Sequence, residues 1–396
     1  MHTKTHGVRI IAIVSWTIAV MAYFFQFPIS FLSSLIIPFL GLYVVLTILS
    51  NRTYLQDIPW FRLYFVYLAY LSIMAIVSVF GNSGIGSVLR FFAALAAIPL
   101  CCMTVEKRFH YEYRTFLFFA VLKSLVLLGF AAYMLYTGTF EPLRRWAYTN
   151  KFGDIYINPN DHLPRVQVHG NGILPMAFIL NETYRKGKRN DLVNFILLLG
   201  ILAAGNFAYI LAIAAFYLLK MLKYITTDGK PVVRKLILAL CLSGAAIVFL
   251  WYAFRQMAYK AEGSNNIRLE QAQVLLSDSN LLLGKGLGHR IYYTGLRTYQ
   301  GETYFELQTL YILNQIGLAG MVFFYALVFR PIWKTGKQET ILFLIYLLYT
   351  FWKPYCFDWN PYCFDSTEMI VILMLINYRA YAERFKTPDL LYGAVA

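Results

Sequence analysis

Charged residues are scarce in this chain. They make up only 14% of its 396 residues, whereas about a quarter is usual for a soluble domain. This excludes a protein built of ordinary solvated domains, and hydrophobic residues reach 59%. Apolar stretches of about 17 to 25 residues, long enough to cross a hydrocarbon core about 30 Å thick, recur along the whole chain. The sequence therefore predicts a single polytopic membrane domain, 1–396.

Motifs for metals and nucleotides are also missing. The five cysteines and six histidines show no zinc-binding spacing, and no Asp-x-Asp pair is present to hold a nucleotide-sugar metal. The segment "GKGLG" (284–288) is not a Walker loop, because no Ser or Thr follows its lysine at the required offset. We expect no cofactor, no metal and no nucleic-acid partner. Whether Cys356 and Cys363 form a disulfide stays open.

The hydropathy pattern predicts an all-α integral membrane protein with about twelve transmembrane helices. The expected spans are 8–27, 29–50, 61–80, 89–105, 115–138, 171–184, 191–205, 207–225, 236–254, 309–329, 340–357 and 367–382. Of the 35 Lys and Arg residues, 22 lie on the side of the N-terminus, 12 lie on the other side, and Lys123 lies inside a span. Positive residues concentrate in cytoplasmic loops, so both termini are expected in the cytoplasm and the long loops 139–170 and 255–308 outside.

The two long outer loops carry grouped cations. The candidate residues for binding a pyrophosphate or a glycan are Arg145, Arg165, His169, Lys285, His289, Arg290 and Arg297. Solvated loops of a basic protein would have the same content. Because the planar fork of arginine matches phosphate oxygens, we also consider the hypothesis that the loops form two cationic walls around an anion.

The second outer loop contains two recognisable local patterns. The stretch "NNIRLEQAQVLLSD" (265–278) predicts a short amphipathic helix with Ile267, Val274 and Leu275 resting on the membrane. After it, alternate glycines in "GKGLGHR" (284–290) permit positive φ angles and close approach of backbone N–H groups to a ligand. This segment is either a cradle for phosphate oxygens or a mobile linker.

Two glutamates follow the glycines. Glu302 and Glu306 are four residues apart and would share one helix face if the tenth span starts early. Repulsion in a pocket of low dielectric constant would raise the pKa of one of them, as a general base requires. Solvated glutamates at a helix end are equally common.

Residues 265–322 resemble the bacterial O-antigen polymerases and O-antigen ligases. The resemblance rests on Arg268 at the start of the amphipathic helix, the turn "LLLGKGLG", and the helix entry "LYILNQIGLAG". The rest of the chain is similar only in hydropathy and in having a second outer loop. The ligases have a His-Asn type pair where this chain has "YFELQ", and an arginine where it has Asn206. Both departures favour a polymerase.

The resemblance implies a glycosyltransferase in the bacterial inner membrane. Its donor would be an oligosaccharide on a polyprenyl pyrophosphate, and an acceptor hydroxyl would attack the anomeric carbon at the outer face. Arg268 would be catalytic, Glu306 or Glu302 would be the base, and the loop cations would stabilise the leaving diphosphate. The implied partners are this lipid-linked oligosaccharide, membrane lipid and a chain-length regulator protein.

Three other functions stay open. One is ligation of the finished glycan to a lipid A core, and another is a non-catalytic role in assembling glycan enzymes. The third is a flippase for lipid-linked oligosaccharides. Such transporters tend to have repeated halves and ionisable groups at mid-membrane. The sequence has no repeated halves, and Lys123 is its one clearly intramembrane charge, so the pattern favours an enzyme.

Overall fold

The computed structural model is mostly helical. It describes residues 2–50, 58–81, 83–103, 110–150, 152–159, 161–184, 188–226, 232–233, 236–237, 240–241, 243–244, 266–277, 280–289, 291, 298–299, 302–303 and 307–333. Most of the predicted span 236–254, and all of 340–357 and 367–382, lie outside the described residues. The same holds for Cys356 and Cys363.

Helices occupy the other nine predicted spans. They are α1 (His2–Phe25), α2 (Ser33–Ser50) after the short 3-10 helix η1 (Ser30–Leu32), α3 (Ile58–Phe80), α4 (Ile85–Met103), α5 (His110–Thr137), α7 (Leu174–Tyr184), α8 (Lys188–Ala204), α9 (Phe207–Thr226) and α12 (Gln308–Trp333). Within the described residues, five helices are long and apolar enough to cross a membrane: Gly7–Phe25, Ser30–Leu49, Phe61–Phe80, Tyr111–Thr137 and Leu310–Val328. The protein is therefore mostly helical, with the long apolar helices of a membrane protein. The full set of twelve spans and the side of each terminus stay predictions.

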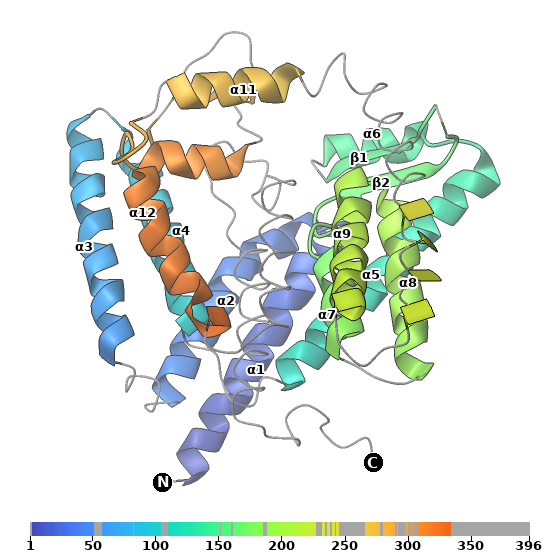
Figure 1. Cartoon of the computed structure of the whole chain (residues 1–396), viewed down its shortest axis with the longest axis horizontal. Coiled ribbons are helices and arrows are strands. Elements are labelled where there is room, and N and C mark those ends of the chain that lie inside the picture. Colours follow the sequence, from blue (N-terminus) through green and yellow to red (C-terminus); the bar gives the residue numbers. More distant parts are fainter. Residues whose placement is uncertain are drawn as a thin grey trace.

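The helices pack in two neighbouring groups (Figure 1). In one, α1 packs along α2 and α5, while α7 lies among α5, α8 and α9. In the other, α12 packs against α3 and α4. Large apolar side chains such as Phe65, Ile76 and Phe80 on α3 are exposed, as expected for helices whose outer faces contact lipid tails. By contrast, every residue from Ile173 to Asn181 around α7 is buried.

The first long loop is a folded cap. It contains α6 (Glu141–Thr149) and the strands β1 (Gly153–Ile157) and β2 (Pro164–Val168), which pair antiparallel with Tyr156 opposite Arg165. No secondary structure was predicted within the loop 139–170, which contains these three short elements. The elements are only nine and five residues long, and their stability comes from packing that hydropathy does not report.

Aromatic packing holds this cap on the helices. Trp146 of α6 contacts Phe27 after α1, Phe130 of α5 and Phe152 before β1, with ring centroids 5.2–6.2 Å apart. Aromatic side chains bury large apolar areas and dominate the energetics of such contacts. The cap is therefore fixed on the ends of α1 and α5.

The second long loop contains α11 (Asn266–Ser277), a helix where the sequence predicted one, but its apolar residues are distributed around the helix and not gathered on one face. Leu275 on it is buried, and α11 packs against α12. The expectation that Leu275 rests on the membrane is wrong, because the protein itself covers this residue. Val274 is half-buried, and the side chain of Ile267 is not described.

Candidate functional site

Both outer loops lie at one end of the bundle. In Figure 1, α6, the β1–β2 hairpin and α11 are at the upper end, and α1 begins at the opposite end. The two segments are about a hundred residues apart in sequence and rest on different helices: β2 on α5 and α8, and α11 on α12. This end is the candidate site, because it gathers the described cations that the sequence analysis selected.

Arg165 is buried near the turn of the hairpin. Its guanidinium Nη2 donates a 2.7 Å hydrogen bond to Asp161 Oδ2, and only 8% of the residue is exposed. Its aliphatic stem lies so close to Gly205, between α8 and α9, that a side chain at Gly205 would collide with it. Arg165, a predicted binding residue, is thus ion-paired with Asp161 and packed against the helices.

Arg165 affects the pKa values of two neighbouring side chains, Asp161 and Tyr156. Burial raises the pKa of the Asp161 carboxyl, but the N–H of Leu163 and the guanidinium of Arg165 outweigh burial and bring this pKa below its ordinary value of 3.8. Burial also raises the pKa of the Tyr156 phenol, although Arg165 acts in the opposite direction. At neutral pH the cluster is therefore an ionised Arg–Asp pair beside a neutral phenol.

Lys123 reaches this cap from inside α5. It is fully buried, and its Nζ donates a 3.0 Å hydrogen bond to the backbone carbonyl of His169, while the ring centroid of Phe27 lies 4.8 Å from it. From the sequence, Lys123 was the one cation expected inside a span. Its partners are the carbonyl that follows β2 and an aromatic face, so its role includes holding the end of the hairpin.

The glycine segment, residues 280–289, is neither a cradle for phosphate nor a loose linker. Gly284, Gly286 and Gly288 adopt φ angles of +79°, +108° and +70°, as the alternate glycines predicted. However, the N–H of Lys285 donates to Asn314 O at 2.7 Å and that of Gly286 to Gln315 O at 3.0 Å. The backbone N–H groups that were expected to bind phosphate therefore donate hydrogen bonds to carbonyls of the protein itself.

A break in α12 explains this pairing. Gly317 has a φ of +64° and a ψ of 179°, which interrupts the helix and exposes backbone groups on both sides. The N–H groups of Leu318 and Ala319 donate to Leu281 O and Leu282 O at 2.8 and 3.1 Å. The glycine segment therefore supplies hydrogen-bond partners for the broken turn, as backbone at membrane depth requires.

Side chains tighten the same junction. The hydroxyl of Tyr70 in α3 lies 2.6 Å from Ile316 O and 3.0 Å from Leu283 O, as donor. Gly286 packs on Ser78 and Gly288 on Ser87, so closely that a Cβ at either position would collide. The segment is clamped between α12 and the α3–α4 connection.

The remaining predicted residues fall in different places. Arg145 is exposed on α6, Lys285 is exposed, and His169 and His289 are half-buried. The backbone of Arg268 lies in the first turn of α11, but its side chain is not described. Arg290, Arg297 and Glu306 lie outside the described residues.

Glu302 corrects one expectation. It lies in the strand β4 (Glu302–Thr303), which pairs with β3 (Thr298–Tyr299), and α12 begins only at Gln308. Glu302 and Glu306 therefore do not share a turn of this helix. They would share a face only if this helix started early, and it begins at Gln308, one residue before the predicted span 309–329.

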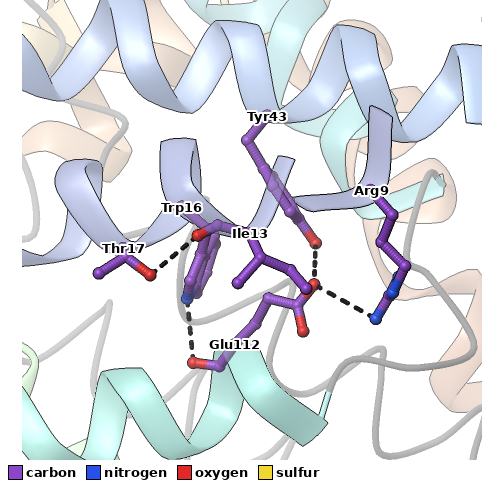
Figure 2. Close-up of polar contacts among 6 residues, drawn as sticks. All are labelled: Arg9, Ile13, Trp16, Thr17, Tyr43 and Glu112. Atoms are coloured by element: carbon purple, nitrogen blue, oxygen red, sulfur yellow. Dashed lines mark hydrogen bonds and ion pairs between the residues drawn. The ribbon is translucent and has the colours of Figure 1, made fainter. Parts of the chain in front are cut away.

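One polar cluster escaped the sequence analysis. Glu112, in the first turn of α5, is fully buried, with its Oε1 4.0 Å from Arg9 Nη2 of α1 and 3.4 Å from the hydroxyl of Tyr43 of α2 (Figure 2). The indole of Trp16 donates to the backbone carbonyl of Glu112 at 2.9 Å. In the sequence, the signal that could have revealed this cluster is an acidic residue next to an apolar span. The cluster ties α1, α2 and α5 together near the end opposite the outer loops.

The chain matches no protein-family model, and no curated protein matches it. Among the described residues, no group of three or more His, Cys, Asp or Glu lies close enough together to hold a metal ion. The function must therefore be inferred from the residues of the outer-loop end and from the membrane setting.

Proposed function

We propose that the protein is a polymerase of O-antigen or a similar surface polysaccharide in the bacterial inner membrane. It would join oligosaccharide repeat units carried on polyprenyl pyrophosphate at the outer face. The observation that supports this proposal best is the gathering of the β1–β2 hairpin, α11 and the glycine segment at one end of an apolar bundle (Figure 1). A lipid-linked glycan has its reactive headgroup at such an end.

In the proposed reaction, the oxygen of an acceptor hydroxyl forms a bond to the anomeric carbon of the donor. The bond between this carbon and the diphosphate oxygen breaks, and the diphosphate leaves with its polyprenyl chain. A carboxylate takes the hydroxyl proton, and Glu302 and Glu306 are the candidates. Arg268, exposed Lys285 and half-buried His289 are the proposed stabilisers of the charge on the leaving group.

The rigidity of the glycine segment supports this assignment. Its backbone is fixed by α12, α3 and the α3–α4 connection, so the side chains of Lys285 and His289 project from a preorganised base. Fixed charges stabilise a developing anion without reorganising during the reaction. Arg165, held by Asp161, is assigned instead to shaping the hairpin.

A lipid-linked oligosaccharide flippase is the second candidate, and one observation favours it. The helices contain a buried acid, Glu112, beside Arg9 in addition to buried Lys123, and intramembrane ionisable groups often mark transport pathways. Ligation to a lipid A core stays the alternative within the same enzyme class.

A gel of extracted surface glycans from a null strain separates these functions. Single repeat units on the lipid core indicate a polymerase. Polymer that stays on the carrier indicates a ligase, and units trapped in the cytoplasm indicate a flippase. The polymerase proposal fails if the null strain still displays long chains.

The site assignment has its own test in Arg268→Ala. We expect loss of chain lengthening with normal abundance of the protein, whereas Gln273→Ala, an exposed change on the same helix α11, should leave chain length unchanged. Chains of normal length in Arg268→Ala would remove α11 from the reaction while leaving the polymerase function open.

A further inference from the structure

The exposed face of α6 lies where lipid headgroups are expected. The span in α5 ends at Thr137, and Gly138, with a φ of +63°, turns the chain into α6 only a few residues later. In Figure 1, α6 runs across the upper ends of α8 and α9 rather than along them. A helix in this position lies in the membrane interface.

Two exposed tyrosines accompany this segment. Tyr136 in the last turn of α5 is 92% exposed, and Tyr148 of α6 is 76% exposed. Tyrosine is enriched at headgroup depth because its ring is apolar and its hydroxyl is polar. The apolar side of α6, with Trp146 and Ala147, packs on the protein instead.

Among the described arginines of this cap, one has no carboxylate as an ion-pair partner. Arg165 is paired with Asp161 at 2.7 Å and Arg144 with Asp154 at 3.0 Å. Arg145 is exposed and, among the described residues, has no ion-pair partner, not even Glu141 one turn earlier. Its charge is therefore available to an external anion, and partly exposed Arg144 adds to the local positive potential.

We propose that α6 is a binding surface for the phosphate group of an anionic phospholipid in the outer leaflet, with Arg145 as its principal contact. A guanidinium donates two parallel hydrogen bonds to phosphate oxygens, and the tyrosines contact the adjacent glycerol and upper chain region. This inference rests on the predicted placement of this end at the outer face and does not depend on glycosyl transfer. It replaces the earlier assignment of Arg145 to the pyrophosphate of the donor.

The test measures binding of phosphatidylglycerol relative to phosphatidylcholine to the purified, full-length protein by native mass spectrometry from mixed micelles. Arg145→Gln should weaken the preference for phosphatidylglycerol about fivefold, the effect of one cation near a charged interface. Asp154→Asn is the counter-variant: it frees Arg144 and should strengthen the preference. Arg145 is exposed and the side chain of Asp154 is 37% exposed, so the fold should be retained.

A parallel titration with a long-chain polyprenyl diphosphate separates the two sources of phosphate. The proposal holds if Arg145→Gln weakens binding of phosphatidylglycerol at least as much as binding of the diphosphate. It is overturned if phosphatidylglycerol binds the variant and the unmodified protein equally, or if the loss is larger for the diphosphate. In the latter case Arg145 belongs to the carrier site.

Discussion

Gln315 binds both backbone polar groups of His289. Its Oε1 accepts from the His289 N–H at 3.0 Å, and its Nε2 donates to the His289 carbonyl at 3.1 Å. Gln315 is fully buried, just before the break in α12. One side chain thus closes the glycine segment onto the helix that it supports.

Replacing Gln315 by Leu should release this end of the glycine segment. The N–H of His289 loses its strongest partner, and two buried hydrogen bonds are lost, at a cost of about 2 kcal/mol. Hydrogen exchange of the amides of residues 284–289 should accelerate. Val322→Ala, at an exposed position of the same helix, is the control. Equal protection in both variants would show that Gln315 does not hold the segment.

Gly317→Ala should destabilise the protein by at least about 2 kcal/mol, because a φ of +64° is strained for alanine. The added Cβ would also collide with the backbone of Gly284 and Leu283. Gly41→Ala is the matched control: a Cβ at this helical position meets nothing within 4 Å, so it should be neutral or slightly stabilising. Unfolding in denaturing detergent measures both. Similar stabilities would contradict the tight junction at Gly317.

The Arg9–Glu112 pair predicts a non-additive double mutant. Arg9→Met alone leaves a buried carboxylate without its cation and should cost about 3 kcal/mol. Arg9→Met combined with Glu112→Gln removes both charges and should cost less than the sum of the two single changes. A double-mutant cycle on the free energy of unfolding measures this coupling, and strict additivity would show that the 4.0 Å contact contributes nothing.

The Asp161–Arg165 pair predicts acid sensitivity of the hairpin. Because folding lowers the pKa of Asp161 below 3.8, its contribution is fully present above that value and is lost as the pH falls through the folded pKa. Protection of the β1–β2 amides against hydrogen exchange should stay constant near neutral pH and decline below about pH 4. Asp161→Asn should abolish this decline, whereas Asp154→Asn should retain it. A decline of equal size in Asp161→Asn would assign it to another group.

The sequence is a reliable guide to features that depend on the conformation of single residues. Glycines at alternate positions permit positive φ at 284, 286 and 288, as the structure has it, because glycine has no Cβ to clash with the backbone. The conformational freedom of glycine does not indicate which acceptors the backbone N–H groups of this segment bond to. Asn314 and Gln315 lie about 30 residues further on, and their carbonyls become acceptors only because α12 breaks at Gly317.

Hydropathy is sufficient to locate α1, α3 and α5, because a lipid environment demands long apolar helices whatever their neighbours are. The partners of Arg165, Lys123 and Glu112 depend instead on the tertiary structure. Each of these charges is buried, and burial of a charge is tolerated only where specific groups from other helices and loops compensate it. Distant segments supply Phe27 and the carbonyl of His169 for Lys123, and Arg9 and Tyr43 for Glu112, and no local pattern in the chain encodes these encounters.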